Sequence, residues 1–141
     1  MNASKLWLLL TCLVASGIIL IHAGSADPAD FRKMTAGVRK KCIAETQTTL
    51  EDVENTEYGH FPNDVRLKCY FKCALEKFKL MDNDGTIKYN MIKKIIPDVY
   101  REIADEMIDS CTDSSKKDKC EKSFNFMKCM FEVNPIAFIA P

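Results

Sequence analysis

The stretch LKCYFKC, residues 67–73, places two cysteines four residues apart in a segment whose apolar residues recur at helical spacing. Residues four apart lie on one face of an α-helix, so Cys69 and Cys73 cannot bridge each other without distorting it. Each is therefore expected to bond to a different segment. Further along, Cys120 and Cys129 are nine residues apart, which puts them on opposite sides of another helix at about 100° per residue. We expect both helices to be cross-linked to their neighbours.

The cysteine content is high for a chain of 141 residues, with seven cysteines in all. Residues 6–23 form an apolar run, LWLLLTCLVASGIILIHA, and small residues follow it as far as Ala26. This layout is typical of a secretory signal peptide, so we expect residues 1–26 to be removed, with cleavage after Ala23 or Ala26. An uncleaved membrane anchor is the alternative interpretation of the same run. Removal takes Cys12 with it and leaves six cysteines.

An exported chain with six cysteines is expected to form three disulfides, because extracellular compartments are oxidising. Spacing alone does not select among the possible pairings. A zinc site is disfavoured, since the mature chain has no Cys-x2-Cys pair and its histidine, His60, is not near a cysteine in sequence. We expect no metal and no cofactor.

Apolar residues recur at helical spacing through nearly the whole mature chain, and no segment shows the sustained alternation of a β-strand. We therefore predict one all-α domain, residues 27–141, with about six helices. The expected helices begin near Pro28 and Thr48, then run from Asn63 or Asp64 to about Phe78, and cover about 89–96, 98–111 and 116–131.

The first two helices carry local signals in the sequence. Asp27 and Pro28 are a typical N-cap and first residue of a helix. Residues spaced by three and four then predict one apolar face of the first helix, made of Phe31, Met34, Val38 and Cys42. Thr48 and Glu51 match the capping box that begins a second helix.

The C-terminal tail, residues 132–141, is unusual because its last six residues carry no charged side chain. Pro135 ends helical continuation. Left in water, Ile136, Phe138 and Ile139 would expose apolar surface worth about 1.5–3 kcal/mol per side chain when buried. We expect the tail to fold back and to plug or wall the interior.

The charge balance and the motifs exclude several functions. Acidic and basic residues number 20 each, which removes the positive potential expected of a nucleic-acid-binding protein. The sequence DNDG, residues 82–85, is interpreted as a turn, because placing Gly85 at position six of an EF-hand calcium loop puts Met91 where glutamate is needed. His60 has no Gly-x-Ser-x-Gly or comparable nucleophile motif to serve, so no enzymatic activity is expected.

The mature cysteines follow the pattern Cys-x26-Cys-x3-Cys-x37-Cys-x8-Cys-x8-Cys, from Cys42 to Cys129. This pattern strongly resembles the six-cysteine insect odorant-binding proteins of the pheromone and general odorant-binding family. The resemblance covers essentially the whole mature chain. It extends beyond the cysteines to LKCYFKC (67–73), DNDG (82–85), Pro97 and CEKSFNFMKC (120–129).

The resemblance implies six helices around an apolar cavity and the disulfides Cys42–Cys73, Cys69–Cys120 and Cys111–Cys129. It implies that the protein binds and carries small hydrophobic odorants or pheromones in extracellular fluid, sensory lymph in particular, with residues 132–141 forming one wall of the cavity. The positions expected to contact ligand are Phe78, Tyr89, Ile92, Ile96, Tyr100, Ala104, Met107, Phe124, Met127, Phe138 and Ile139. The hydroxyls of Tyr89 and Tyr100 are candidates for orienting the ligand.

Two other functions fit the sequence: a carrier or scavenger in saliva, haemolymph or reproductive fluid, and a structural secreted domain with a filled core. Candidate protein partners are an odorant receptor and a second copy of the chain. Nucleic acid and a membrane span after signal removal are not expected. Many members of the family are thought to release ligand when histidines are protonated. Because the mature chain keeps only His60, we expect any acid release to depend on carboxylates and to occur at lower pH.

Overall fold

The computed structural model describes residues 28–112, 115 and 117–141. Its elements are α2 (Pro28–Thr46), α3 (Leu50–Asn55), the 3-10 helix η1 (Thr56–Tyr58), α4 (Val65–Lys77), α5 (Tyr89–Ile95), the 3-10 helix η2 (Asp98–Tyr100), α6 (Arg101–Ser110) and α7 (Lys119–Val133). Met81 and Ile87 form an isolated antiparallel bridge. The prediction of an all-α fold is confirmed. The expected signal peptide, residues 1–26, lies outside the described residues.

Side-chain caps fix where the longer helices begin. Asp64, one of the two residues expected to begin this helix, caps α4 by accepting hydrogen bonds from the backbone N–H groups of Arg66 and Leu67. Asp118 caps α7 by accepting a hydrogen bond from the backbone N–H of Glu121. This cap explains why α7 begins later than the sequence suggested.

The capping box of α3 lies one residue later than predicted. Thr49 and Asp52, rather than Thr48 and Glu51, exchange the two hydrogen bonds of the box. Gln47 adopts a left-handed conformation, φ 60°, directly after α2, and Thr48 is buried next to it. The chain is thereby turned so that the Thr49 hydroxyl is the one placed at the start of α3.

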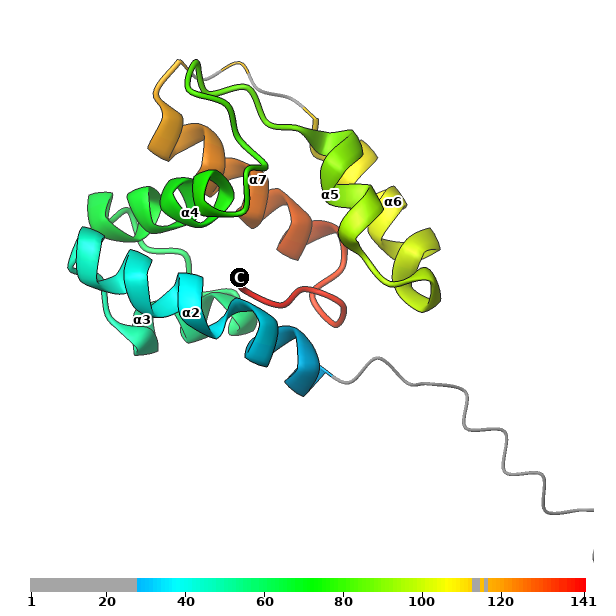
Figure 1. Ribbon diagram of the computed structural model, residues 1–141, viewed down its shortest axis with the longest axis horizontal. Helices are drawn as coiled ribbons and strands as arrows, with labels where there is room; N and C mark the ends of the chain where they lie inside the picture. Colours follow the sequence, from blue (N-terminus) through cyan, green and yellow to red (C-terminus); the bar gives the residue numbers. More distant parts are fainter. Residues whose placement is uncertain (1–27, 113–114, 116) are drawn as a thin grey trace, which may run out of the picture.

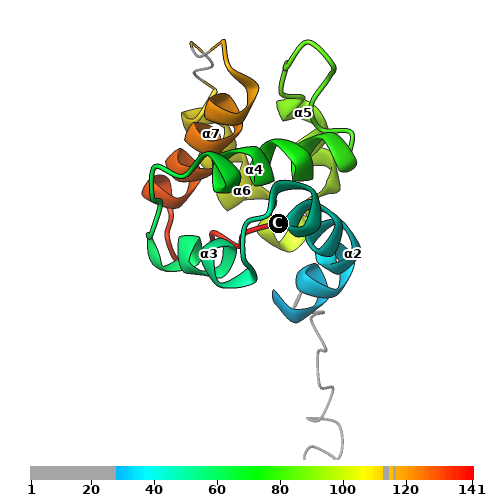
Figure 2. The ribbon, with the colours of Figure 1, turned by 90° about the vertical axis from the view of Figure 1, so that its left-hand side faces the viewer.

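The helices surround the end of the chain. α4 packs against α2 on one side and α7 on the other, and α5 and α6 pack against each other beside α7. Figures 1 and 2 both show the C-terminal tail running inward from α7 and ending between α2, α3 and α4. Among the described residues, no helix combines the length and apolar character needed to span a membrane.

Three disulfides cross-link this arrangement in the pairing that the resemblance implied. Cys42–Cys73 joins α2 to α4, and Cys69–Cys120 joins α4 to α7. Cys111–Cys129 joins the end of α6 to α7. The two cysteines of α4 thus bond to different helices, and α7 is held from two sides, as their spacing predicted.

The interior face of α2 is partly polar, which differs from the prediction. Thr35, Arg39 and Cys42 are buried, whereas Met34 is 59% exposed. Since Thr35, Arg39 and Cys42 are four and three residues apart, they form one stripe along the helix. Arg39 can be buried because its guanidinium pairs with the carbonyl oxygen of Ala140 and with Glu54.

Candidate functional site

The residues predicted to contact ligand come together from α5, α6, α7, the end of α4 and the tail. Tyr100 is the main exception, since it is 39% exposed and lies at the surface. Ile139 is half-buried. The others are either buried or packed against the buried hydrophobic cluster: Ile92, Ala104, Met107, Phe124, Met127 and Phe138 in the first group, and Phe78, Tyr89 and Ile96 in the second.

An aromatic cluster occupies the part of the interior next to α4. The Phe61 ring lies at its centre and contacts four other rings. Edge-to-face and tilted contacts of this kind stabilise a core beyond the burial of area. The centroid distances from Phe61 are 5.7 Å to Phe124, 5.7 Å to Phe131, 6.1 Å to Phe138 and 6.4 Å to Phe71.

Sequence reasoning identified Phe124 and Phe138 but missed Phe61, the residue that joins them. Phe61 lies between η1 and α4, where helical periodicity carries no information about burial. Gly59 was the one local feature of the sequence that could have indicated a close-packed turn next to Phe61. It has a φ of 85°, and a Cβ atom there would lie 2.9 Å from Cζ of Phe131. A glycine therefore permits both the turn and the close approach of the Phe131 ring.

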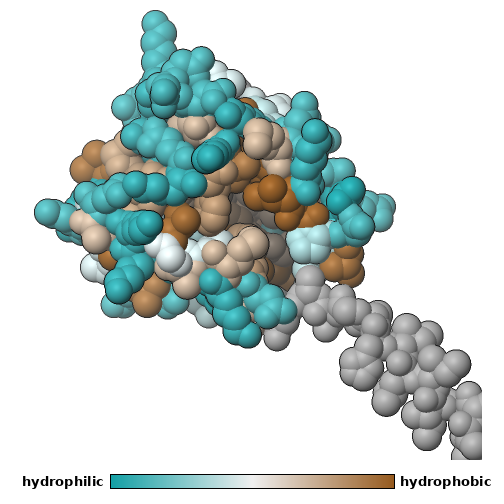
Figure 3. Space-filling model, in the orientation of Figure 1, coloured by the Kyte–Doolittle hydropathy of each residue, from teal (hydrophilic) through white to brown (hydrophobic). Residues whose placement is uncertain are grey.

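The other part of the interior consists of aliphatic and thioether side chains from α5, α6 and α7. They are Ile92, Ile96, Ala104, Met107 and Met127. Figure 3 shows a hollow in this face of the molecule, between the α5–α6 side and the C-terminal tail, with hydrophobic surface along its border. The apolar groups beside α5 and α6 are thus next to a depression rather than under a closed surface.

The hydroxyl of Tyr89, expected to orient a ligand, contacts the protein's own backbone. It donates a hydrogen bond to the carbonyl oxygen of Thr112 at 3.4 Å. The Tyr89 ring packs edge-on against Phe126, with 5.4 Å between centroids. These two contacts hold the start of α5 against α7 and against the segment that follows α6.

The tail folds back, as its uncharged sequence predicted, but one of its side chains does not go inside. Phe138, Ala140 and Pro141 are buried. Ile136 is 96% exposed, so the expectation that its apolar surface is buried was wrong. It stands in a turn in which the backbone N–H of Ala137 donates to the Asn134 side chain at 3.1 Å. This turn directs Phe138 inward and leaves Ile136 in solvent.

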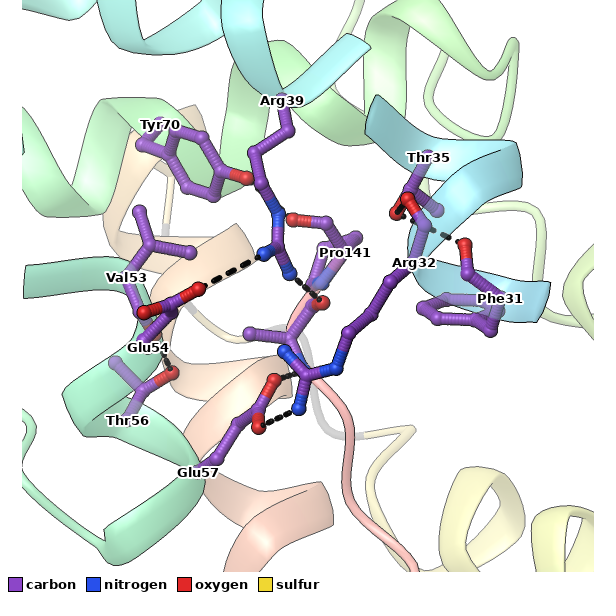
Figure 4. Close-up of polar contacts among 11 residues, drawn as sticks. Phe31, Arg32, Thr35, Arg39, Val53, Glu54, Thr56, Glu57, Tyr70 and Pro141 are labelled. Carbon is purple, nitrogen blue, oxygen red and sulfur yellow. Dashed lines mark hydrogen bonds and ion pairs between the residues drawn. The ribbon is translucent and has the colours of Figure 1, made fainter. Parts of the chain in front are cut away.

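Polar groups hold the last residues of the tail in place (Figure 4). The guanidinium of Arg39 donates to the carbonyl oxygen of Ala140 at 2.8 Å, and the N–H of Ala140 donates to Glu57 at 3.1 Å. Both backbone groups of this residue are therefore satisfied by side chains, as buried backbone requires. The Tyr70 hydroxyl donates to the carbonyl oxygen of Pro141.

Two ion pairs complete this arrangement, which we call the tail clasp: Arg32, Arg39, Glu54, Glu57 and Tyr70. Arg32 lies 2.6 Å from Glu57, and Arg39 lies 3.5 Å from Glu54. The hydrogen bond with Glu57 raises the pKa of Arg32. Burial raises the pKa of Tyr70 to about 12, so its hydroxyl stays protonated and can donate at physiological pH.

Lys68 is a buried lysine of α4 that contacts both the aromatic cluster and a polar side chain of α7. Lys68 is only 9% exposed, and its ammonium group donates to Asn63 and Glu121. The same nitrogen lies 5.5 Å from the centroid of the Phe124 ring, within the range of a cation–π contact. Lys68 thus links α4 to α7 beside the Cys69–Cys120 disulfide.

Comparisons with known proteins cover most of the chain. The sequence model of the PBP/GOBP family matches residues 25–133. General odorant-binding protein 19d of Drosophila melanogaster is 27% identical over 132 residues, which cover 87% of this chain and 88% of that protein. The similarity therefore includes all the helices described above.

Solved structures give the same result for the fold. Odorant binding protein 5 of Apis mellifera superimposes with a TM-score of 0.75 at 27% identity, covering 83% of this chain and 99% of that one. Odorant Binding Protein 7 from Anopheles gambiae, solved with four disulfide bridges and in complex with an azo compound, superimposes with a TM-score of 0.65 at 28% identity. That match covers 73% of this chain and 85% of the other.

Proposed function

The chain belongs to the PBP/GOBP family, and from this premise we propose that it is a secreted carrier of small hydrophobic molecules of the odorant or pheromone type. The carrier domain is residues 27–141, and the fluid is sensory lymph. Members of this family bind and transport ligands and are not enzymes, and we extend the same absence of catalysis to this chain. An odorant receptor and a second copy of the chain are the candidate protein partners.

One observation carries this proposal: apolar side chains from three helices meet beside a hollow that the C-terminal tail borders (Figure 3). Ligand would contact Ile92, Ile96, Ala104, Met107 and Met127 on the α5–α6 side. Phe124 and Phe138 would close the aromatic end, where both rings contact Phe61. Removal of apolar ligand surface from water supplies the affinity in such a site.

The tail clasp gives the carrier a defined wall. Phe138 can face the interior because Arg39 and Glu57 hold Ala140, two residues further on. Without these partners the buried N–H and carbonyl of Ala140 would each lose a hydrogen bond at a cost of about 1–3 kcal/mol. The polar groups therefore keep an uncharged segment in one position while its apolar side chains are available to ligand.

The decisive test distinguishes a ligand cavity from a filled core. We would measure binding of the apolar fluorescent dye N-phenyl-1-naphthylamine to the native protein and to Ala104→Phe, with Ile103→Phe as the matched control. Ala104 is buried and Ile103 is 42% exposed, although they are neighbours on α6. We expect saturable micromolar binding to the native protein, a loss of about tenfold or more in Ala104→Phe, and little change in the control.

The same variants test the structural alternative through stability. If the interior is filled, a phenylalanine at position 104 overpacks it and lowers stability by about 1–3 kcal/mol. If the interior holds space for a ligand, Ala104→Phe should keep its melting temperature while losing dye. No saturable binding by native protein with its three disulfides verified by mass spectrometry would overturn the carrier proposal.

A further inference from the structure

One carboxylate oxygen on α6 is buried without a hydrogen bond. Oδ1 of Asp105 is shielded from solvent and has no hydrogen-bond partner within the part of the chain that the structure describes. Buried polar groups are almost always paired, and a buried carboxylate oxygen without a donor is costly. The other such atom is Nε of Arg39, which belongs to the tail clasp.

Two cations placed near Asp105, one on α6 and one on α5, pair with other acidic residues. Arg101 precedes it by one helical turn, the spacing of an ion pair, but its guanidinium pairs with Asp98. Lys93 of α5 pairs with Asp109 at 2.6 Å, one turn further along α6. Both of these positive charges are thus paired with another acidic residue, and no described residue donates a hydrogen bond to Oδ1 of Asp105.

The helix geometry places Asp105 between the interior and α5. Ala104, Met107 and Ile108 form the buried stripe of α6, and Asp109 lies on the side that faces Lys93. At 100° per residue, Asp105 falls between Ile108 and Asp109 around the helix axis. It therefore borders the aliphatic part of the interior, on the seam where α5 and α6 pack together. Figure 1 shows these two helices side by side.

We propose that Asp105 is the polar recognition residue of the ligand site and accepts a hydrogen bond from a donor group on an otherwise aliphatic ligand. The inference rests on the proposed carrier function. A ligand that brings one hydroxyl or amine N–H would satisfy the oxygen that the protein leaves unpaired. Its chain would lie against Ile92, Ile96 and Met107, and flexible thioether side chains adapt well to such chains.

The ligand class follows from these surroundings. The rings of the aromatic cluster are engaged with one another, and α5 and α6 contain no phenylalanine. A flexible alkyl chain with one donor at its end therefore fits this side of the site better than a planar aromatic molecule. A hydroxyl and an ammonium group can both donate a hydrogen bond to a carboxylate oxygen, and comparing an alcohol with an amine distinguishes them.

The test compares ligands that differ only in the donor. Dye displacement would be measured with 1-dodecanol, dodecylamine and dodecyl methyl ether, which share one alkyl chain. We expect native protein to bind at least one of the two donor ligands about tenfold or more tightly than the ether, the size expected of one hydrogen bond to a charged group. In Asp105→Leu that preference should disappear, while affinity for the ether stays within about twofold. Which donor ligand shows the preference tells whether the site selects a neutral or a cationic group.

The matched control is Asp109→Leu, one turn along the same helix, which should keep the preference for the donor ligand. Equal affinity of native protein for all three ligands would overturn the inference even if Asp105→Leu failed to fold. A preference that survives in Asp105→Leu would overturn it as well. Both results leave the carrier proposal standing, because that proposal fails only when native protein binds neither the dye nor any of the ligands.

Discussion

α4 and the α5–α6 pair are both helical walls of one interior, but they are held in different ways. Within α4, Leu67, Tyr70 and Phe71 are fully buried, and disulfides tie the helix to α2 and to α7. The segment from α5 to α6, residues 89–110, exposes large hydrophobic side chains and has its one disulfide just beyond its end. Those exposed side chains are Met91, Ile95, Val99, Tyr100 and Ile103.

The α5–α6 segment buries fewer side chains than α4, namely Ile92, Ala104, Met107 and Ile108, and is also anchored at its two ends. The DNDG turn before it is held by Lys122, whose ammonium donates to the carbonyl oxygen of Gly85 at 3.0 Å, and by Lys119, which donates to Asn83. After it, Cys111 bonds to Cys129. Segments with few buried apolar contacts open at lower free energy than the core. α2, α4 and α7 therefore form a cross-linked frame, whereas α5 and α6 form the wall best suited to admit a ligand.

The largest loss of stability should follow from breaking a disulfide, and we compare one from each region. Replacing Cys69 and Cys120 by alanine opens a closure of 51 residues, whereas replacing Cys111 and Cys129 opens one of 18. Loop entropy predicts losses in the free energy of unfolding of about 4 and about 3 kcal/mol, respectively. Urea denaturation of both variants measures these losses. A larger loss for the Cys111–Cys129 variant would contradict the assignment of the frame.

Truncating one apolar side chain in each region should give the next largest effect. Leu67→Ala in α4 removes a fully buried side chain and should cost about 2–5 kcal/mol. Ile95→Ala in α5 removes a side chain that is 50% exposed, and it should cost well under half as much. Thermal unfolding of the two variants and native protein provides the measurement. Equal losses would show that the α5–α6 segment is as firmly packed as α4.

The same two regions explain what could be predicted from the sequence. α4 was placed nearly to its ends because local signals coincide there: the Asp64 cap, buried residues at helical spacing, and two cysteines on one face. The cysteine pattern also led to the correct disulfides through the resemblance. Tyr100 was predicted to contact ligand but is partly exposed, since η2 interrupts the helix expected over 98–111 and changes which side chains face inward.

The tail clasp could not be predicted, because its contacts join residues that are far apart in the chain. Arg39 and Ala140 are 101 residues apart, and Glu57 and Ala140 are 83 apart. A buried arginine looks in sequence like any exposed helical residue. Its position is decided by whether a distant segment offers a carbonyl oxygen, and helical periodicity contains no such information. The same holds for Oδ1 of Asp105, whose lack of a hydrogen-bond partner among the described residues is visible only in three dimensions.

Alkaline pH should weaken the frame through Tyr70. Because burial raises the pKa of Tyr70 from 10.0 to about 12, the folded protein keeps a proton that the unfolded chain loses. This stabilising contribution is complete below pH 10 and is lost as the pH rises from about 10 to about 12, to a total of roughly 2–3 kcal/mol. Urea denaturation at pH 8 and pH 11 measures the loss. Tyr70→Phe should lose less stability than native protein over that interval, and an identical loss would refute the role of Tyr70.

The smallest effect is expected from His60, the only histidine within residues 27–141. His60 is exposed in the loop between η1 and α4 and is not a member of the tail clasp, so His60→Gln should leave dye affinity unchanged from pH 7 to pH 6.

Within the clasp, the charged and titratable groups that face one another are Arg32, Arg39, Glu54, Glu57 and Tyr70. The two carboxylates of the clasp pair with Arg32 and Arg39, so a carboxylate-dependent release would be sought at the tail. We expect affinity to fall only under acid stronger than the histidine range. Glu57→Gln should already show reduced affinity at pH 7, because it removes the charge that pairs with Arg32 and weakens the hydrogen bond that holds Ala140. A complete loss of binding between pH 7 and pH 6 that persists in His60→Gln would show that groups outside this cluster control release. The acid response would then have to be sought in the α5–α6 segment rather than at the tail.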